Sequence, residues 1–261
     1  MMKKYIKDML HRKDLMIYLI LSGLKSKHRN TWLGYFWWLL DPLLNMVVYY
    51  FLMVIILGRG SDEFPFPVFL AIGIVVFKWF SSSLTGNARS ISTKSGIITQ
   101  VYLPKALFPI GDNITQLINF LFGMVIVVVF LVVFRIPPSV HLVWLPFIIV
   151  VQLMFHMAIG LFVAYFSVFI RDIEHVLGHF TRILRYASPV IWETGRLPKE
   201  YNWIVTGNPF SQILMAYRDV LMFDTMPNLY TLSGILVASL MISVFMIYYY
   251  SGNEHKIIKV L

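Results

Sequence analysis

The stretch KSKHRNTWLGYFWWLLDPLLNMVVYYFLMVIIL, residues 25–57, decides the fold, because a basic and aromatic segment runs directly into a long apolar run. Crossing the hydrocarbon core of a bilayer takes about 20 mostly apolar residues. Residues 37–57 meet this need, with Asp41 and Asn45 as the interruptions. Tryptophan is enriched where such helices meet water, and Trp32 precedes the run. The stretch therefore predicts a transmembrane helix with a basic flank.

The composition of the whole chain agrees with a membrane protein. Hydrophobic residues make up 58% and charged residues 13% of the 261 residues, whereas soluble domains carry about 25% charge. The chain has no cysteine, which excludes disulfides and thiolate metal sites. Eight of the 22 Lys and Arg fall in the first 30 residues, a pattern that a membrane anchor gives as readily as a nucleic-acid-binding segment. We expect a membrane and no nucleic acid.

The apolar runs predict an all-α polytopic membrane protein with one domain, residues 1–261. Six spans are expected, at 37–57, 64–82, 106–134, 142–170, 176–192 and 231–250. The fifth is the weakest because Arg182 and Arg185 interrupt it. Residues 210–223 are apolar but too short to span, so we expect a re-entrant or interfacial segment in an extracellular region at 193–229, broken by Gly207, Asn208 and Pro209. Gly160 and Ala164 predict a close helix contact.

The distribution of basic residues predicts the orientation. With six spans, 16 of the 22 Lys and Arg lie on the side of the N-terminus and five on the other, with Lys78 near the inner end of the second span. Cytoplasmic segments are rich in Lys and Arg, so both termini are expected in the cytoplasm. Residues 1–30 read as an amphipathic helix on the inner membrane surface.

Three polar segments allow two interpretations each. Asp41-Pro42 fits a helix N-cap better than a substrate-sensing carboxylate inside the membrane. Residues 85–103 form either a plain loop or a docking helix, and the docking helix is favoured by the length of the segment. Arg171 and Asp172 fit an interfacial anchor and a helix cap better than the lining of an entrance.

The sequence lacks the motifs of several enzyme classes. No G-x-x-x-x-G-K-[ST], G-x-S-x-G or H-E-x-x-H pattern occurs, so we expect no catalytic or metal site and no phosphate-cradling loop. His175 and His179 are four residues apart, but no third ligand beyond Glu174 is nearby. Energy for transport against a gradient would come from a partner or from an ion.

Several short motifs together resemble the membrane subunit of ABC-2-type exporters of bacterial polysaccharides, most closely those that export wall teichoic acid. The resemblance covers nearly the whole chain. Its motifs are residues 25–42, Pro104 with Lys105 and Pro109, 171–173, 188–192 with 197–198, and 208–210 with 217–219.

This resemblance implies a homodimer of the chain, bound to two copies of a separate ABC ATPase that holds ATP and magnesium, in a bacterial plasma membrane. The substrate would be a lipid-pyrophosphate-linked glycopolymer. It implies a coupling helix at about 87–98. The residues expected to couple this helix to the ATPase are Asn87, Arg89, Ile91, Lys94 and Ile97. The pyrophosphate would enter at Lys25, Lys27, Arg29 and Trp32. Candidates for aromatic contacts along the channel are Tyr35, Trp37, Tyr49, Tyr50 and Trp192.

Other functions remain open from the sequence. Within the same family, the cargo could be O-antigen or capsular polysaccharide. An ion-coupled secondary transporter would need an intramembrane carboxylate, for which Asp41 and Asp112 are candidates, and usually an internal repeat, which is absent. A membrane enzyme of polymer assembly is disfavoured by the missing catalytic motifs. A stable ATPase partner would separate the first class from the others.

Overall fold

The computed structural model describes residues 2–26, 32–58, 64–98 and 102–260, and all regular elements in these ranges are helices. The α-helices are α1 Met2–His11, α2 Lys13–Ser26, α3 Trp37–Tyr50, α4 Phe66–Arg89, α5 Ser95–Ile98, α6 Leu107–Val133, α7 Leu145–Phe169, α8 Ile173–Ala187, α9 Trp203–Thr206, α10 Pro209–Arg218 and α11 Leu229–Val260. Short 3-10 or π turns are η1 Gly34–Phe36, η2 Phe51–Ile56, η3 Ser92–Lys94, η4 Val140–Trp144, η5 Thr194–Arg196, η6 Lys199–Tyr201 and η7 Asp219–Phe223.

Five helical segments in the described ranges are long and apolar enough to cross a membrane. They are Leu39–Ile56, Phe66–Arg89, Leu107–Val133, Val140–Phe169 and Leu229–Val260. They correspond to five of the six spans that the sequence predicts. The remaining one, the fifth predicted span at 176–192, falls mainly on α8, which has 15 residues and is therefore about 22 Å long, less than the roughly 30 Å of a hydrocarbon core. The six-span count stays a prediction.

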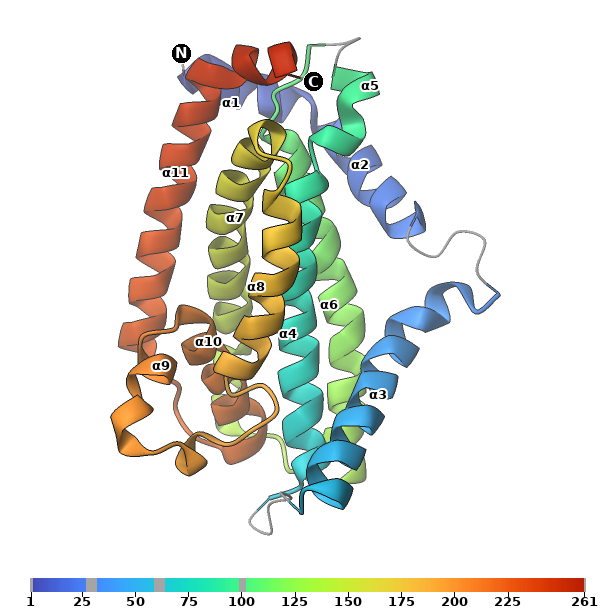
Figure 1. Ribbon diagram of the computed structural model, residues 1–261, viewed down its shortest axis with the longest axis vertical. Helices are drawn as coiled ribbons and strands as arrows, with labels where there is room; N and C mark the ends of the chain where they lie inside the picture. Colours follow the sequence, from blue (N-terminus) through green and yellow to red (C-terminus); the bar gives the residue numbers. More distant parts are fainter. Residues whose placement is uncertain (1, 27–31, 59–63, 99–101, 261) are drawn as a thin grey trace.

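Helix α4 forms the centre of the bundle. It contacts α3, α6, α7, α8 and α10, and 78% of its membrane-length window is buried within the chain. Only 11% of the membrane-length window of the α3 segment is buried within the chain. Helix α3 leans away from the other helices in Figure 1. Residues 66–77 of α4 are apolar on every side of the helix, which suits a helix segment with neighbours all round.

Both termini lie at one end of the bundle, called here the terminal end, where α1 meets the last turns of α11 (Figure 1). The single helix predicted for residues 1–30 is instead two helices, α1 and α2, which are separated at Arg12. Tyr5 is the buried residue of α1. The position of these helices on a membrane surface stays a prediction.

The opposite end of the bundle carries α9, α10 and η7 (Figure 1). Helix α8 ends at Ala187 because Pro189 follows Ser188, whose backbone is extended, as residues before proline prefer. Helix α10 begins as expected after Gly207: the Asn208 side chain accepts a hydrogen bond from the Phe210 amide, and Pro209 occupies the first turn. The re-entrant path of this segment stays a prediction.

A buried arginine joins α10 to its neighbours. The guanidinium of Arg218 donates to the carbonyls of Pro189, Val190 and Phe69, and it lies 3.3 Å from the centre of the Phe69 ring. Arg218 is 3% exposed. It therefore links α10, the segment after α8, and the first turn of α4.

Candidate functional site

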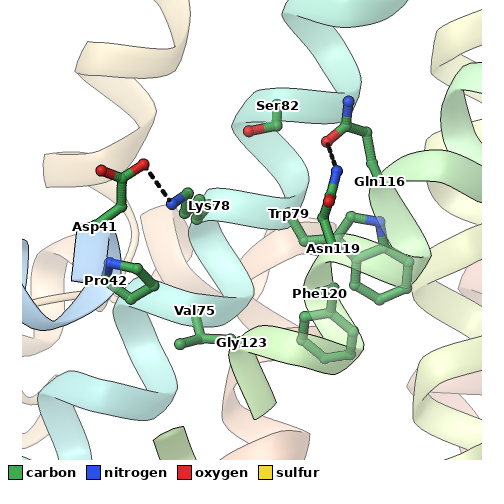
Figure 2. A pocket seen from close by; sticks show the side chains of 10 residues that line it. All are labelled: Asp41, Pro42, Val75, Lys78, Trp79, Ser82, Gln116, Asn119, Phe120 and Gly123. Carbon is green, nitrogen blue, oxygen red and sulfur yellow. Dashed lines mark hydrogen bonds and ion pairs between the residues drawn. The ribbon is translucent and has the colours of Figure 1, made fainter. Parts of the chain in front are cut away.

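An ion pair between α3 and α4 lies at the middle of the bundle. Lys78 Nζ is 3.1 Å from Asp41 Oδ2 (Figure 2). Lys78 is the thirteenth of the 24 residues of α4, so it lies at the middle of this helix, and its position relative to the inner end of the span stays a prediction. The N-cap prediction for Asp41 is wrong: α3 begins at Trp37, with both Asp41 and Pro42 inside the helix. An ionisable residue at this depth is a functional candidate.

Three cavities lie along α4, and the ion pair lines two of them. The smallest, the α6 cavity of about 30 Å³, opens between α3, α4 and α6 (Figure 2). Asp41, Lys78 and Ser82 also line the α8 cavity, of about 220 Å³, which reaches Arg185 of α8. Gln116 and Asn119 line both the α6 cavity and the α2 cavity, of about 470 Å³, which extends to Leu19 and Gly23 of α2. The cavities form a series along α4 from the terminal end to mid-bundle.

The side chains around the α6 cavity combine polar and aromatic groups. Asn119 donates to Gln116 at 3.2 Å on one side (Figure 2). Trp79 stacks on Phe120 with 4.3 Å between the ring centres. Trp79 Nε1 and Asn119 Oδ1 are buried without a hydrogen-bond partner in the described structure. Such a mixture of amide groups, a charge pair and aromatic faces suits weak contacts with a polar, hydroxyl-rich or anionic group.

The residues predicted to meet the pyrophosphate are only partly described. Lys27 and Arg29 lie outside the described residues. Lys25 is exposed in the last turn of α2, and Trp32 is 99% exposed just before η1. Lys25 and Trp32 therefore lie at the two sides of the 27–31 segment. Their role stays a prediction.

The five aromatic candidates occupy different environments. Tyr49 lines the α8 cavity, where its hydroxyl accepts a hydrogen bond from Arg185 Nη1 at 2.9 Å. Tyr50 is half-buried against the core, and Trp37 is half-buried at the start of α3. Trp192 donates its indole N–H to the carbonyl of Tyr186. Tyr35 belongs to η1, and its side chain lies outside the described part.

The predicted ATPase-coupling segment is not one helix. Residues up to Arg89 extend α4, and then η3 and the single turn α5 follow. Arg89 is exposed and pairs with Glu174 at the start of α8, Ile97 is 38% exposed, and Lys94 is half-buried. These three side chains are accessible at the terminal end.

Two residues of the predicted coupling set are enclosed by the chain. Asn87 is fully buried and exchanges hydrogen bonds of 3.2 Å with Asn113 of α6. Ile91 is 1% exposed. Helix packing encloses both side chains, and their part in coupling to an ATPase stays a prediction.

Arg171 and Asp172 lie where α7 turns into α8. Both side chains are exposed. Asp172 occupies the N-cap position of α8 but makes no side-chain capping bond. Arg171 borders a cavity of about 400 Å³ with Glu174 and His175. No group of three or more metal-ligating side chains occurs in the described ranges.

A carboxylate that the sequence did not single out organises the terminal end. Glu254 of α11 accepts from Tyr102 Oη at 2.6 Å and from the Lys105 amide at 3.4 Å, and the Ala106 amide donates to Tyr5 Oη at 3.3 Å. The bond to Glu254 raises the pKa of Tyr102 to about 12. Burial lowers the pKa of Lys105, against the opposing effect of Glu254. Burial and a side-chain interaction with Glu254 raise the pKa of Tyr5 of α1. Glu254 therefore ties α11 to α1 and to the segment that leaves the coupling turn.

Replacing Glu254 with alanine should loosen α1. Hydrogen bonds to a charged group contribute about 1.5–3 kcal/mol each, so amide exchange of residues 2–11 should become about 10-fold faster or more. Hydrogen–deuterium exchange on the purified protein measures this. Lys256→Ala, an exposed neighbour on the same helix, is the control and should leave exchange unchanged. Equal rates in the Glu254→Ala variant and the wild type would contradict the assignment.

Comparison with known proteins shows which proteins the chain is similar to. No family model matches the chain. It is 27% identical to the O-antigen export system permease protein RfbA of Klebsiella pneumoniae, over 89% of this chain and 91% of the relative. It is 26% identical to the RfbA permease of Myxococcus xanthus, over 92% and 93%. It is also 24% identical to the polysialic acid transport protein KpsM of Escherichia coli, over 78% and 80%.

These homologues are ABC-2-type polysaccharide exporter permeases. The chain is similar to these export permeases over most of its length, and its helices of membrane-spanning length are consistent with a multi-pass membrane protein. The teichoic acid specificity expected from the motifs has no counterpart among these permeases.

Proposed function

We propose that the chain is the membrane subunit of an ATP-driven exporter that carries a lipid-linked cell-surface polysaccharide out of the cytoplasm. The observation that carries this proposal is the similarity to polysaccharide export permeases over almost the full length of both partners. The helices of membrane-spanning length and the chain of polar cavities along α4 are consistent with a transport role.

The complex in this proposal contains two copies of the chain and two copies of an ABC ATPase, which binds ATP and magnesium. The terminal end faces the cytoplasm, in agreement with the excess of Lys and Arg there. The accessible residues Arg89, Lys94 and Ile97 form the contact with the ATPase, and Asn87 and Ile91 support it from within. Lys25, Lys27, Arg29 and Trp32 receive the pyrophosphate.

The identity of the polymer has two candidates. Wall teichoic acid is favoured by the motif resemblance, and O-antigen or capsular polysaccharide is favoured by what the relatives are named for. A strain that lacks the gene should accumulate lipid-linked polymer inside the cell, and chemical analysis of that polymer identifies the cargo. Normal surface polymer in this strain, or a full-length tagged protein that purifies without an ATPase, would overturn the proposal.

The docking contact is tested by Ile97→Glu. A carboxylate at this exposed apolar position on α5 should remove apolar contact with the ATPase, at about 1.5–3 kcal/mol for a fully buried side chain. The amount of co-purified ATPase should fall about 10-fold or more. Ile258→Glu is the matched control, since Ile258 is 43% exposed and lies on the last turns of α11 at the same end. Equal ATPase recovery from both variants would refute the contact.

A further inference from the structure

The α8 cavity holds more positive than negative charge at mid-bundle. Apart from tyrosine, the ionisable side chains that line this cavity are Asp41, Lys78 and Arg185. Their charges sum to one net positive charge. Lys78 pairs with Asp41 at 3.1 Å. Among the ion pairs of the described residues, none includes Arg185. A cation without a counter-charge in a membrane-spanning region is costly unless an anion or water compensates it.

The guanidinium of Arg185 is held in place and still has capacity to donate. Its Nη1 donates to Tyr49 Oη at 2.9 Å, and its Cζ lies 4.9 Å from the centre of the Phe77 ring. Its Nε is buried without a partner in the described structure. These contacts fix the plane of the guanidinium beside the cavity, so its N–H fork does not have to be ordered when a ligand arrives.

The other groups around the cavity are mostly donors or can act as donors. Asn45, Tyr49, Ser81 and Ser82 line it together with Lys78. The side chains of Lys78 and Asp41 are 32% and 41% exposed, so the ion pair is open to a ligand. An oxyanion could replace Asp41 as the partner of Lys78 and also pair with Arg185, so that neither cation would be left unpaired. Charge-assisted bonds from Lys and Arg to phosphate oxygens are among the strongest in proteins.

We propose that the α8 cavity is a binding site for a phosphate oxyanion, held by Arg185 and Lys78, with Asp41 as the carboxylate that the ligand displaces from Lys78. The volume of about 220 Å³ is many times the space that one water molecule needs. This inference rests on the proposed function, in which the oxyanion belongs to the lipid-linked substrate. Lys25 and Trp32, which receive the pyrophosphate in the proposed function, do not line the α8 cavity.

Direct binding tests the site on the purified complex of full-length chain and ATPase without nucleotide. The two probes are inorganic pyrophosphate in solution and a polyprenyl diphosphate in phosphatidylcholine nanodiscs. Arg185→Gln and Lys78→Gln should each weaken binding of the lipid diphosphate about 10-fold or more. Asp41→Asn should tighten it, because Lys78 loses its competing partner. A gain of affinity cannot arise from misfolding.

Arg182→Gln is the matched control, since Arg182 is an exposed arginine on the same helix and does not line the cavity. It should bind as the wild type does. Binding of both probes with the same pattern across the variants assigns a site for the phosphate group itself, whereas binding of the lipid probe alone assigns a site that also needs the lipid. Both outcomes support the proposal.

Two outcomes would overturn it. One is unchanged affinity for both probes in Arg185→Gln and Lys78→Gln. The other is a wild-type complex that binds neither probe, in which case a carboxylate of a second copy compensates the charge. A complex that exports polymer but gives either result refutes this site and leaves the proposed function standing. A complex that binds the probes normally but does not export polymer supports this site and counts against the proposed function.

Discussion

Replacing Arg218 with leucine should strongly destabilise the bundle. The substitution leaves the carbonyls of Phe69, Pro189 and Val190 without the donor that they share. Each buried polar group without a partner costs about 1–3 kcal/mol, so the loss should be about 3 kcal/mol or more. We expect the apparent melting temperature of the purified protein to fall by roughly 5–10 °C.

Two variants make this measurement specific. Arg218→Lys should give an intermediate loss, because one ammonium cannot reproduce the planar fork that reaches three carbonyls. Arg182→Leu removes an exposed arginine and should change the melting temperature little. If the Arg218→Leu variant has the same melting temperature as the wild type, the three hydrogen bonds from Arg218 to backbone carbonyls do not stabilise the fold as described.

The second large effect is expected for Gly160→Ala in α7. A Cβ atom at this position would lie 2.6 Å from Asn87 Nδ2 and 2.8 Å from Asn113 Nδ2. Asn87 cannot easily move, because it also donates to the Ser83 carbonyl at 2.6 Å. Overpacking of a buried site costs about 1–3 kcal/mol, and a lower melting temperature is the readout.

The matched control is Gly178→Ala in α8, where an added Cβ meets nothing within 4 Å. This change should be neutral or stabilising by up to about 1 kcal/mol, because alanine favours helix more than glycine does. Equal effects of the two substitutions would show that the contact of α7 with α4 and α6 is looser than the structure indicates.

The sequence predicted the membrane-length helices well where hydropathy alone decides them. It placed the end of the second span at residue 82, but α4 continues to Arg89. The extra turns carry polar side chains that find partners inside the protein: Thr85 donates to the Ser81 carbonyl, and Asn87 pairs with Asn113. A hydropathy window cannot detect such bonds, because the partner of Asn87 is on another helix.

The candidate site was predictable only in part for the same reason. Local spacing made Asp41 a helix cap, whereas its partner Lys78 is 37 residues away. The charge of Lys78 within an apolar run was a usable signal of function. Arg185 also interrupted an apolar run, but its partner Tyr49 is on a distant segment. Glu254 gave no comparable local signal, since its role depends on Tyr102 on a distant segment. The close contact predicted at Gly160 is confirmed by its packing against both asparagines.

The burial of α4 has a mechanical consequence. A helix that contacts five neighbouring helices and is 78% buried over its membrane-length window resists bending, because a bend would open voids against several neighbours at once. Its 24 residues make a stiff rod about 36 Å long. One end of the rod continues into η3 and α5, and the other end holds Phe69 against Arg218. A displacement applied at the turn after Arg89 would therefore travel along the rod with little attenuation, past Lys78, to the far end of the molecule.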